Sequence, residues 1–351
     1  MGERVKIEIM DTTLRDGEQT SGVSFVPHEK LMIARLLLED LKVDRVEVAS
    51  ARVSDGEMEA VRMICEWAAL RNHLHKVEVL GFVDGKTSVD WIREAGCRVI
   101  NLLCKGSLKH CTQQLKKSPE EHINDIKETI YYAHSQGIQV NMYLEDWSSG
   151  MKHSPEYVFQ LMDALQTTPV QRFMLPDTLG ILNPLQVIEY MRKMKKRYPK
   201  KHFDFHAHND YDLAVSNVLA AVLSGVKGLH TTINGLGERA GNAPLSSVQA
   251  ILKDHFEATT NIDESRLNDV SRVVVVLHGD QISHKGGHLL VAEGSAGAAL
   301  HRLPREGRVG DPRVQADGVE SARHFYDASR LGVGHENTSF SLDYLYHTPK
   351  P

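Results

Sequence analysis

The sequence predicts a TIM barrel, in which eight parallel strands, each followed by a helix, close into a cylinder. Short apolar segments alternate with longer segments of helical periodicity from residue 5 to about residue 255. Eight such units in about 250 residues match the number and the length that this fold requires. An open, doubly wound sheet is the alternative, but eight regular units favour closure.

The predicted elements follow one another in strict alternation. The strands are short runs of apolar residues, at 5–10, 45–49, 77–82, 99–104, 139–144, 172–175, 203–208 and 228–233. The helices are predicted at 27–41, 55–70, 88–95, 119–135, 155–166, 184–197, 210–223 and 244–256. Several of them begin with proline, whose missing N–H costs little in the first turn of a helix.

The bulk composition narrows the class of protein. Hydrophobic residues make up 41%, charged residues 25%, and the net charge is −5, which gives no reason to expect nucleic acid or a membrane surface as a partner. No apolar run approaches about 18 residues, so no transmembrane helix is expected. The N-terminus lacks the apolar core of a signal peptide. The four cysteines form no C-x-x-C pair, which favours free thiols in a cytoplasmic protein.

The segment His206-Ala207-His208, late in the chain, is half of a metal site. Alternate side chains of a strand share a face, so both imidazoles would point the same way. The carboxylate of Asp16 would complete a set that suits a divalent cation such as Mn²⁺, Mg²⁺ or Zn²⁺. Asn242 could add a carbonyl oxygen or hold a water molecule. The alternative is that the two histidines are ordinary polar residues.

The candidate polar residues lie where the predicted barrel would place an active site. Active sites of TIM barrels lie at the carboxyl ends of the strands. The candidates fall there: Asp16 follows the first strand, Glu145 ends the fifth, Thr178 follows the sixth, His206 and His208 end the seventh, and Asn242 follows the eighth.

Three further residues suggest what such a metal would do. Arg15 places a fixed cation beside Asp16, and a cation with a metal can polarise a ketone and stabilise an enolate. Glu145 either forms a salt bridge, for example with Arg15, or transfers a proton at a carbon acid. Thr178 either grips a ligand carboxylate or serves a turn or a helix cap. The glycine-rich loop at 235–242 suits phosphate only weakly, because it lacks the established phosphate-binding patterns.

These motifs resemble a known family. Leu14-Arg-Asp-Gly-Glu-Gln19, followed by Lys30, resembles the first signature of the 2-isopropylmalate synthase and homocitrate synthase family, the DRE-TIM metallolyases. Residues 205–210 and 234–242 resemble its second signature and its strand-eight loop, and the likeness runs from about residue 5 to 272. The resemblance implies a Claisen condensation of acetyl-CoA with a 2-oxo acid, followed by thioester hydrolysis. It implies these roles: Asp16, His206, His208 and Asn242 hold the metal, Arg15 polarises the 2-oxo acid, Thr178 binds its carboxylate, and Glu145 is the catalytic glutamate.

Within this family, residues 81–85, 101–107, 143–148 and 209–213 resemble the (R)-citramalate synthase branch, which uses pyruvate and serves isoleucine biosynthesis. Leu80, Leu103 and Tyr143 would then line a pocket for a methyl group, unless they are ordinary core residues. A 2-isopropylmalate synthase of leucine biosynthesis, acting on 2-oxoisovalerate, is the alternative, since one methylene changes discrimination by only about 1–3 kcal/mol. The lyase branch carries a cysteine in the strand-eight loop, and residues 235–242 have none.

The last part of the chain departs from the family. The β-α rhythm stops near Val273, so we divide the chain into a barrel at 1–272 and an atypical tail at 273–351 without regular structure. The family's linker subdomain carries a histidine motif that completes the site, often across a homodimer. Residues 315–318 read Gln-Ala-Asp-Gly and lack that histidine. A shifted reading frame or a decayed gene would explain this, and a metal-binding barrel without turnover is the functional alternative.

Overall fold

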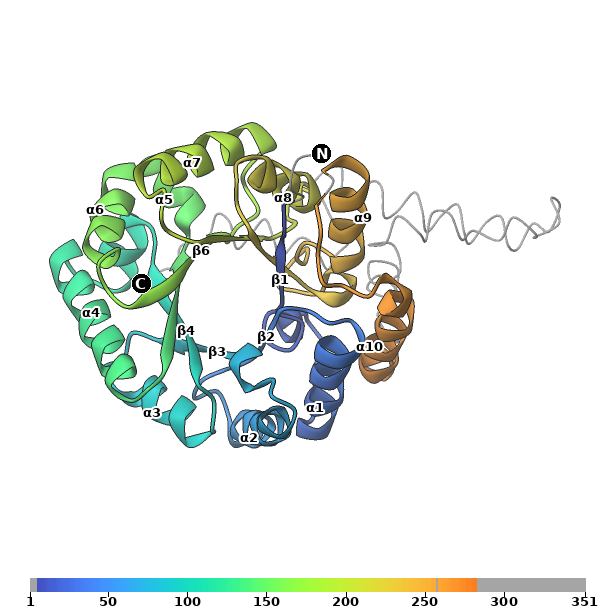
Figure 1. The fold of residues 1–351 in the computed structure, drawn as a ribbon. Helices are drawn as coiled ribbons and strands as arrows, with labels where there is room; N and C mark the ends of the chain where they lie inside the picture. Colours follow the sequence, from blue (N-terminus) through green and yellow to red (C-terminus); the bar gives the residue numbers. More distant parts are fainter. Residues whose placement is uncertain (1–4, 257, 283–351) are drawn as a thin grey trace.

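A computed structural model describes residues 5–256 and 258–282 and shows a closed barrel surrounded by helices (Figure 1). Eight parallel strands pair in chain order, and β1 pairs with β8 to close the cylinder. The predicted TIM barrel is confirmed, and the pairing of the first strand with the last excludes the open sheet. No helix in the described part of the chain is both long and apolar enough to cross a membrane.

Each strand overlaps its predicted range. The strands are β1 Glu8–Asp11, β2 Arg45–Ser50, β3 Val77–Phe82, β4 Val99–Lys105, β5 Gln139–Glu145, β6 Val170–Asp177, β7 Phe203–Ala207 and β8 Gly228–Thr231. The largest difference is at β1, where Lys6 forms only an isolated bridge with Thr259.

The helices form the outer layer. They are α1 Pro27–Arg35, α2 Asp55–Leu70, α3 Thr87–Glu94, α4 Pro119–Ser135, α5 Trp147–His153, α6 Pro155–Leu165, α7 Pro184–Arg197, α8 Ala214–Leu223, α9 Leu245–His255 and α10 Leu267–Ile282. Helices α5 and α10 are additional to the predicted set. Helix α8 begins four residues late because Asp212 has a φ of 56°, a left-handed conformation that a helix does not admit.

The strands are buried on both faces, as parallel strands in a barrel must be. On β7, Phe203 and Phe205 belong to the large apolar cluster shared with the helices. Asp204 and His206, which alternate with them, face the barrel interior. Charged groups fill the barrel interior at the amino-terminal end of the strands. There the Arg45 guanidinium donates to Glu78 (3.1 Å) and to Asp204 (2.6 Å). Pairing offsets the cost of burying these charges.

Helix α10 crosses the predicted domain boundary at residue 272. It packs beside α1 (Figure 1), and its Val270 and Val274 are buried. The Asn234 side chain, in the loop after β8, donates to the Ser271 carbonyl (3.2 Å). The expectation that the tail lacks regular structure from residue 273 is wrong for residues 273–282, because α10 continues through them. The division of the chain at residue 272 stays a prediction, since the tail from 283 onward lies outside the described residues.

Candidate metal centre

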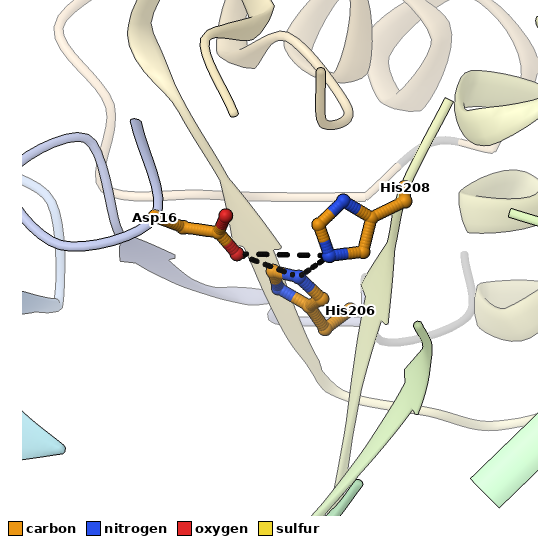
Figure 2. Close-up of side chains that lie close together, drawn as sticks. All are labelled: Asp16, His206 and His208. Carbon is orange, nitrogen blue, oxygen red and sulfur yellow. Dashed lines mark hydrogen bonds and ion pairs between the residues drawn. The ribbon is translucent and has the colours of Figure 1, made fainter. Parts of the chain in front are cut away.

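Three side chains converge at the carboxyl end of the barrel, as Figure 2 shows. His206 is on β7, His208 lies just past its end, and Asp16 is in the loop after β1. The Nε2 atoms of the two histidines are 3.2 Å apart. They lie 3.1 Å and 3.8 Å from Oδ2 of Asp16. The fold therefore brings together the three residues that the sequence placed almost 200 positions apart.

Burial and charge set the protonation of this cluster. Burial alone would raise the pKa of the Asp16 carboxyl, but the Arg15 guanidinium and the two imidazoles hold it well below its usual range. Burial lowers the pKa of His208 to about 3, with Asp16 opposing that shift. At neutral pH the cluster therefore contains an ionised carboxylate and a neutral His208 imidazole, which are the forms that bind a metal.

The residues fit a divalent cation. Nε2 of His206 lies 3.2 Å from Nε2 of His208 and 3.1 Å from Oδ2 of Asp16, so three potential ligand atoms point toward one another. The second oxygen of Asp16 is buried without a partner among the described residues, as is Oδ1 of Asn242. Buried polar atoms rarely remain unsatisfied, and a cation among these donors would satisfy them.

Asn242 lies beside His208, with which it forms an isolated antiparallel bridge. Its Nδ2 donates to the Leu236 carbonyl (3.0 Å), so Oδ1 is the atom left to bind. This arrangement is compatible with the predicted carbonyl ligand.

The Arg15 guanidinium is held from three sides. Its Nε donates to Oε2 of Glu47 (2.6 Å), one terminal nitrogen lies 3.1 Å from Asp16, and the other donates to the Tyr143 hydroxyl (3.4 Å). These contacts use one N–H of each nitrogen, so each terminal nitrogen keeps one N–H for another group. Arg15 is thus a rigid cation beside the metal centre.

The salt bridge considered for Glu145 is present, but its partner is not Arg15, the example that the sequence suggested. Glu145 forms its ion pair with Lys105, and the two residues are direct neighbours in the register of β4 and β5. Glu47 takes the place next to Arg15, and it also accepts bonds from Thr12 (2.9 Å) and Asn101 (2.7 Å). Glu47 was not among the residues predicted from the sequence. A carboxylate in the middle of the apolar run Val46-Glu47-Val48 was the signal that could have found it.

Thr178 lies on the same rim and is partly exposed. Its hydroxyl oxygen accepts from the backbone N–H of Asp146 (2.9 Å), and its carbonyl accepts from Arg239 (2.7 Å). Arg239 in turn holds Asp210 through two bonds, of 2.7 and 3.0 Å. The Asp146 bond links two loops that lie 32 positions apart in the sequence, so it is neither the turn nor the helix cap considered for Thr178, and it leaves the hydroxyl hydrogen to donate to a ligand.

The three predicted pocket residues do meet. Leu80 and Tyr143 form a small buried cluster with Met10 and Met174 inside the barrel, and Leu103 packs against it. The ring of Tyr143 meets the ring of His206 edge to face, with centroids 6.2 Å apart. The apolar cluster therefore adjoins the candidate metal centre, and it includes two methionines that were not predicted from the sequence.

Known proteins resemble this chain in sequence, and solved structures resemble it in fold. A family model described as HMGL-like matches residues 6–274. The putative (R)-citramalate synthase CimA of Methanopyrus kandleri is 34% identical over 279 residues, covering 79% of this chain and 53% of the relative. The 2-isopropylmalate synthase of Saccharolobus solfataricus is 35% identical over 276 residues, covering 78% and 69%.

The chain thus spans about half the length of the Methanopyrus relative. Among solved structures, hydroxymethylglutaryl-CoA lyase from Pseudomonas aeruginosa has a TM-score of 0.68 at 18% identity, covering 80% of this chain and 95% of that one, and it shares the fold. The family resemblance of the motifs is confirmed, and the chain belongs to the HMGL-like (DRE-TIM) family.

Proposed function

We propose that this chain is an acyl-CoA-dependent synthase that condenses acetyl-CoA with a 2-oxo acid and hydrolyses the resulting thioester. The observation that carries the proposal is the clamped Arg15, whose free N–H groups lie beside Asp16, His206 and His208. A fixed cation at a metal centre suits a ketone whose oxygen gains negative charge during the reaction. Two relatives are named as a putative (R)-citramalate synthase and a 2-isopropylmalate synthase, which supports a synthase activity for this chain.

The side chains divide the binding of the 2-oxo acid. Asp16, His206 and His208, with Asn242, would hold a divalent cation, Mn²⁺, Mg²⁺ or Zn²⁺. Such a cation supplies Lewis-acid polarisation of the ketone when bound. Arg15 donates its remaining N–H groups to the 2-oxo acid, and the free hydroxyl hydrogen of Thr178 donates to the carboxylate.

Glu145 is the proposed base at the thioester. Its carboxylate removes a proton from the methyl group of acetyl-CoA, and the resulting carbon attacks the ketone carbon, whose oxygen gains a proton. Water then cleaves the thioester, releasing the thiol of coenzyme A and the product acid. The ion pair with Lys105 fixes the direction of the Glu145 carboxylate at the rim.

We propose pyruvate as the 2-oxo acid and (R)-citramalate as the product, a step of isoleucine biosynthesis in the cytoplasm. The dense apolar cluster of Met10, Leu80, Leu103, Tyr143 and Met174 supports a small substrate side chain. The alternative is 2-oxoisovalerate, in a 2-isopropylmalate synthase of leucine biosynthesis. Each additional methylene costs only about 1–3 kcal/mol of discrimination, so the two substrates must be compared directly.

A second candidate is a barrel that binds metal without turnover. It is supported by residues 315–318, which read Gln-Ala-Asp-Gly without the histidine that the family's linker motif carries. If residues beyond 282 contribute to the site, we expect a homodimer.

The release of coenzyme A thiol distinguishes these proposals. The full chain is incubated with acetyl-CoA and either pyruvate or 2-oxoisovalerate, with Mn²⁺, Mg²⁺ or Zn²⁺ added in turn. Faster release with pyruvate supports citramalate synthesis, and faster release with 2-oxoisovalerate supports the alternative. Bound metal without thiol release from any 2-oxo acid supports the inactive barrel.

The metal centre is tested separately. His206→Ala removes one ligand, so we expect stoichiometric Mn²⁺ binding to be lost in a calorimetric titration. His255→Ala, which replaces an exposed histidine on α9, is the matched control and retains it. Full Mn²⁺ binding by His206→Ala would refute the site.

A further inference from the structure

We propose that His230, supported by Asp204, positions the Tyr143 hydroxyl so that its oxygen faces Arg15 as a hydrogen-bond acceptor. The inference rests on the proposed function, in which Arg15 binds the 2-oxo acid. His230 and Asp204 are thus positioning residues, which act on the substrate through Tyr143 and Arg15.

The four side chains form a chain of contacts through the barrel interior. Oδ2 of Asp204, on β7, lies 3.2 Å from Nε2 of His230 on β8. Nδ1 of His230 lies 2.9 Å from the Tyr143 hydroxyl on β5. That hydroxyl accepts from Arg15 at 3.4 Å. The four residues of this series of contacts come from three strands and from the loop after β1.

The chemistry of the partners fixes the direction of each bond. Ionised Asp204 has no hydrogen, so Nε2 of His230 must donate to it. In a neutral imidazole Nδ1 is then an acceptor, and the Tyr143 hydroxyl hydrogen points toward it. The other side of the Tyr143 oxygen faces a guanidinium, which can only donate. Both neighbours of the hydroxyl therefore require the same orientation.

Asp204 is held firmly in place at the start of this series of contacts. Its Oδ2 also accepts from Arg45 (2.6 Å), and its Oδ1 lies 3.3 Å from Arg172. The half-buried His202 lies 2.9 Å from the same Oδ1, but the two guanidinium groups hold Asp204 without it. Two guanidinium groups already balance its charge, so it places no demand on His230 for a positive charge. Asp204 and His230 are both fully buried, which keeps water from competing for the Tyr143 hydroxyl.

Without His230 the Tyr143 hydroxyl would lose its acceptor and could turn its hydrogen toward Arg15. The guanidinium would then lose one of its three contacts and gain a repulsive neighbour. The cost of one buried hydrogen bond predicts about a tenfold weaker binding of the 2-oxo acid.

The first test is nitrogen NMR of the full chain, labelled with ¹⁵N-histidine and bound to Mg²⁺, and it needs no turnover. The His230 resonances are those missing from His230→Phe. We expect a protonated Nε2 and an unprotonated Nδ1, and Tyr143→Phe should shift the Nδ1 signal because it removes the donor. A protonated Nδ1, or an Nδ1 signal unmoved by Tyr143→Phe, would overturn the proposal whether or not the chain is a synthase.

The second test is steady-state kinetics with acetyl-CoA and the 2-oxo acid that the chain accepts. We expect His230→Phe to raise the KM for the 2-oxo acid about tenfold, with kcat nearly unchanged. His230→Gln, whose amide can both donate and accept, should recover most of the loss. The double variant His230→Phe/Tyr143→Phe should have a KM for the 2-oxo acid no higher than that of Tyr143→Phe alone, because both substitutions interrupt the same series of contacts.

His202→Phe is the matched control, since it removes an imidazole from the other oxygen of Asp204. It should leave KM unchanged. Additive effects of the His230 and Tyr143 substitutions, or an equal rise in KM for His202→Phe, would contradict positioning through Tyr143. If no 2-oxo acid is turned over, the proposed function fails while the NMR result stands by itself.

Discussion

Asp11, at the end of β1, predicts a pH-dependent loss of stability. The side chain is fully buried, its Oδ1 accepts from the backbone N–H of Thr13 (2.8 Å), and its Oδ2 has no partner among the described residues. Burial without a nearby cation raises the pKa of this carboxyl from 3.8 to about 7, against the opposing effect of the Thr13 bonds. The native state therefore binds a proton more tightly at Asp11 than the unfolded chain does.

The size of the effect follows from linkage. Because the pKa is raised in the folded state, stability falls as the pH rises through 3.8 and on to about 7. The shift is about 3 pKa units and each unit corresponds to about 1.4 kcal/mol, so the full cost is about 4 kcal/mol above neutral pH. Asp11→Asn keeps an oxygen for the Thr13 N–H and carries no charge. We expect it to be more stable than the natural protein by about 4 kcal/mol near pH 8.5, and by less than about 1 kcal/mol near pH 4.

Urea unfolding, followed by circular dichroism at several pH values, measures this difference. The comparison of the two proteins at each pH cancels the contributions of other titrating groups. Asp254→Asn, which changes an exposed carboxylate on α9, is the control and should show a constant difference. A difference for Asp11→Asn that does not grow between about pH 4 and pH 8.5 would show that the carboxyl is not held protonated by burial.

Three further predictions concern other parts of the barrel. Glu47→Gln removes one of the two carboxylates that contact Arg15, so the KM for the 2-oxo acid should rise about tenfold while Mn²⁺ binding, measured by calorimetry, is retained. Gly228→Ala would place a Cβ 1.9 Å from Oδ1 of Asp204, and the melting temperature should fall as expected for about 1–3 kcal/mol of overpacking. Ser118→Ala removes the capping box of α4 and should cost about 1 kcal/mol in urea unfolding.

The barrel could be predicted because its signals are local and repeated. Eight apolar runs and the prolines that begin several helices each reported one element, and the count of units gave closure. The start of α8 was less accessible, since a left-handed residue such as Asp212 leaves little trace in a pattern of hydrophobicity. Helix α5 is only seven residues long, too short for a clear period.

At the candidate site, residue type singled out Asp16, His206 and His208, because two histidines at strand spacing and a carboxylate after another strand are typical metal ligands. Partners across the barrel were harder to predict. Which carboxylate reaches Arg15 depends on the strand register, and register places Glu145 beside Lys105 and leaves Glu47 for Arg15. The inward positions of His230 and Asp204 could have been counted from period two, but their mutual contact depends on the closure of the barrel.

The contacts among the rim loops limit how such a protein can change. The loop after β5 is bonded to the loop after β6 through Asp146 and Thr178, and Arg239 from the loop after β8 joins Thr178 to Asp210. TIM barrels diversify by exchanging loops on a constant scaffold. Here a loop transplanted alone from a relative would leave its neighbours' hydrogen bonds unmatched. These loops form one connected unit, and engineers who seek a new acceptor specificity should exchange them as a set.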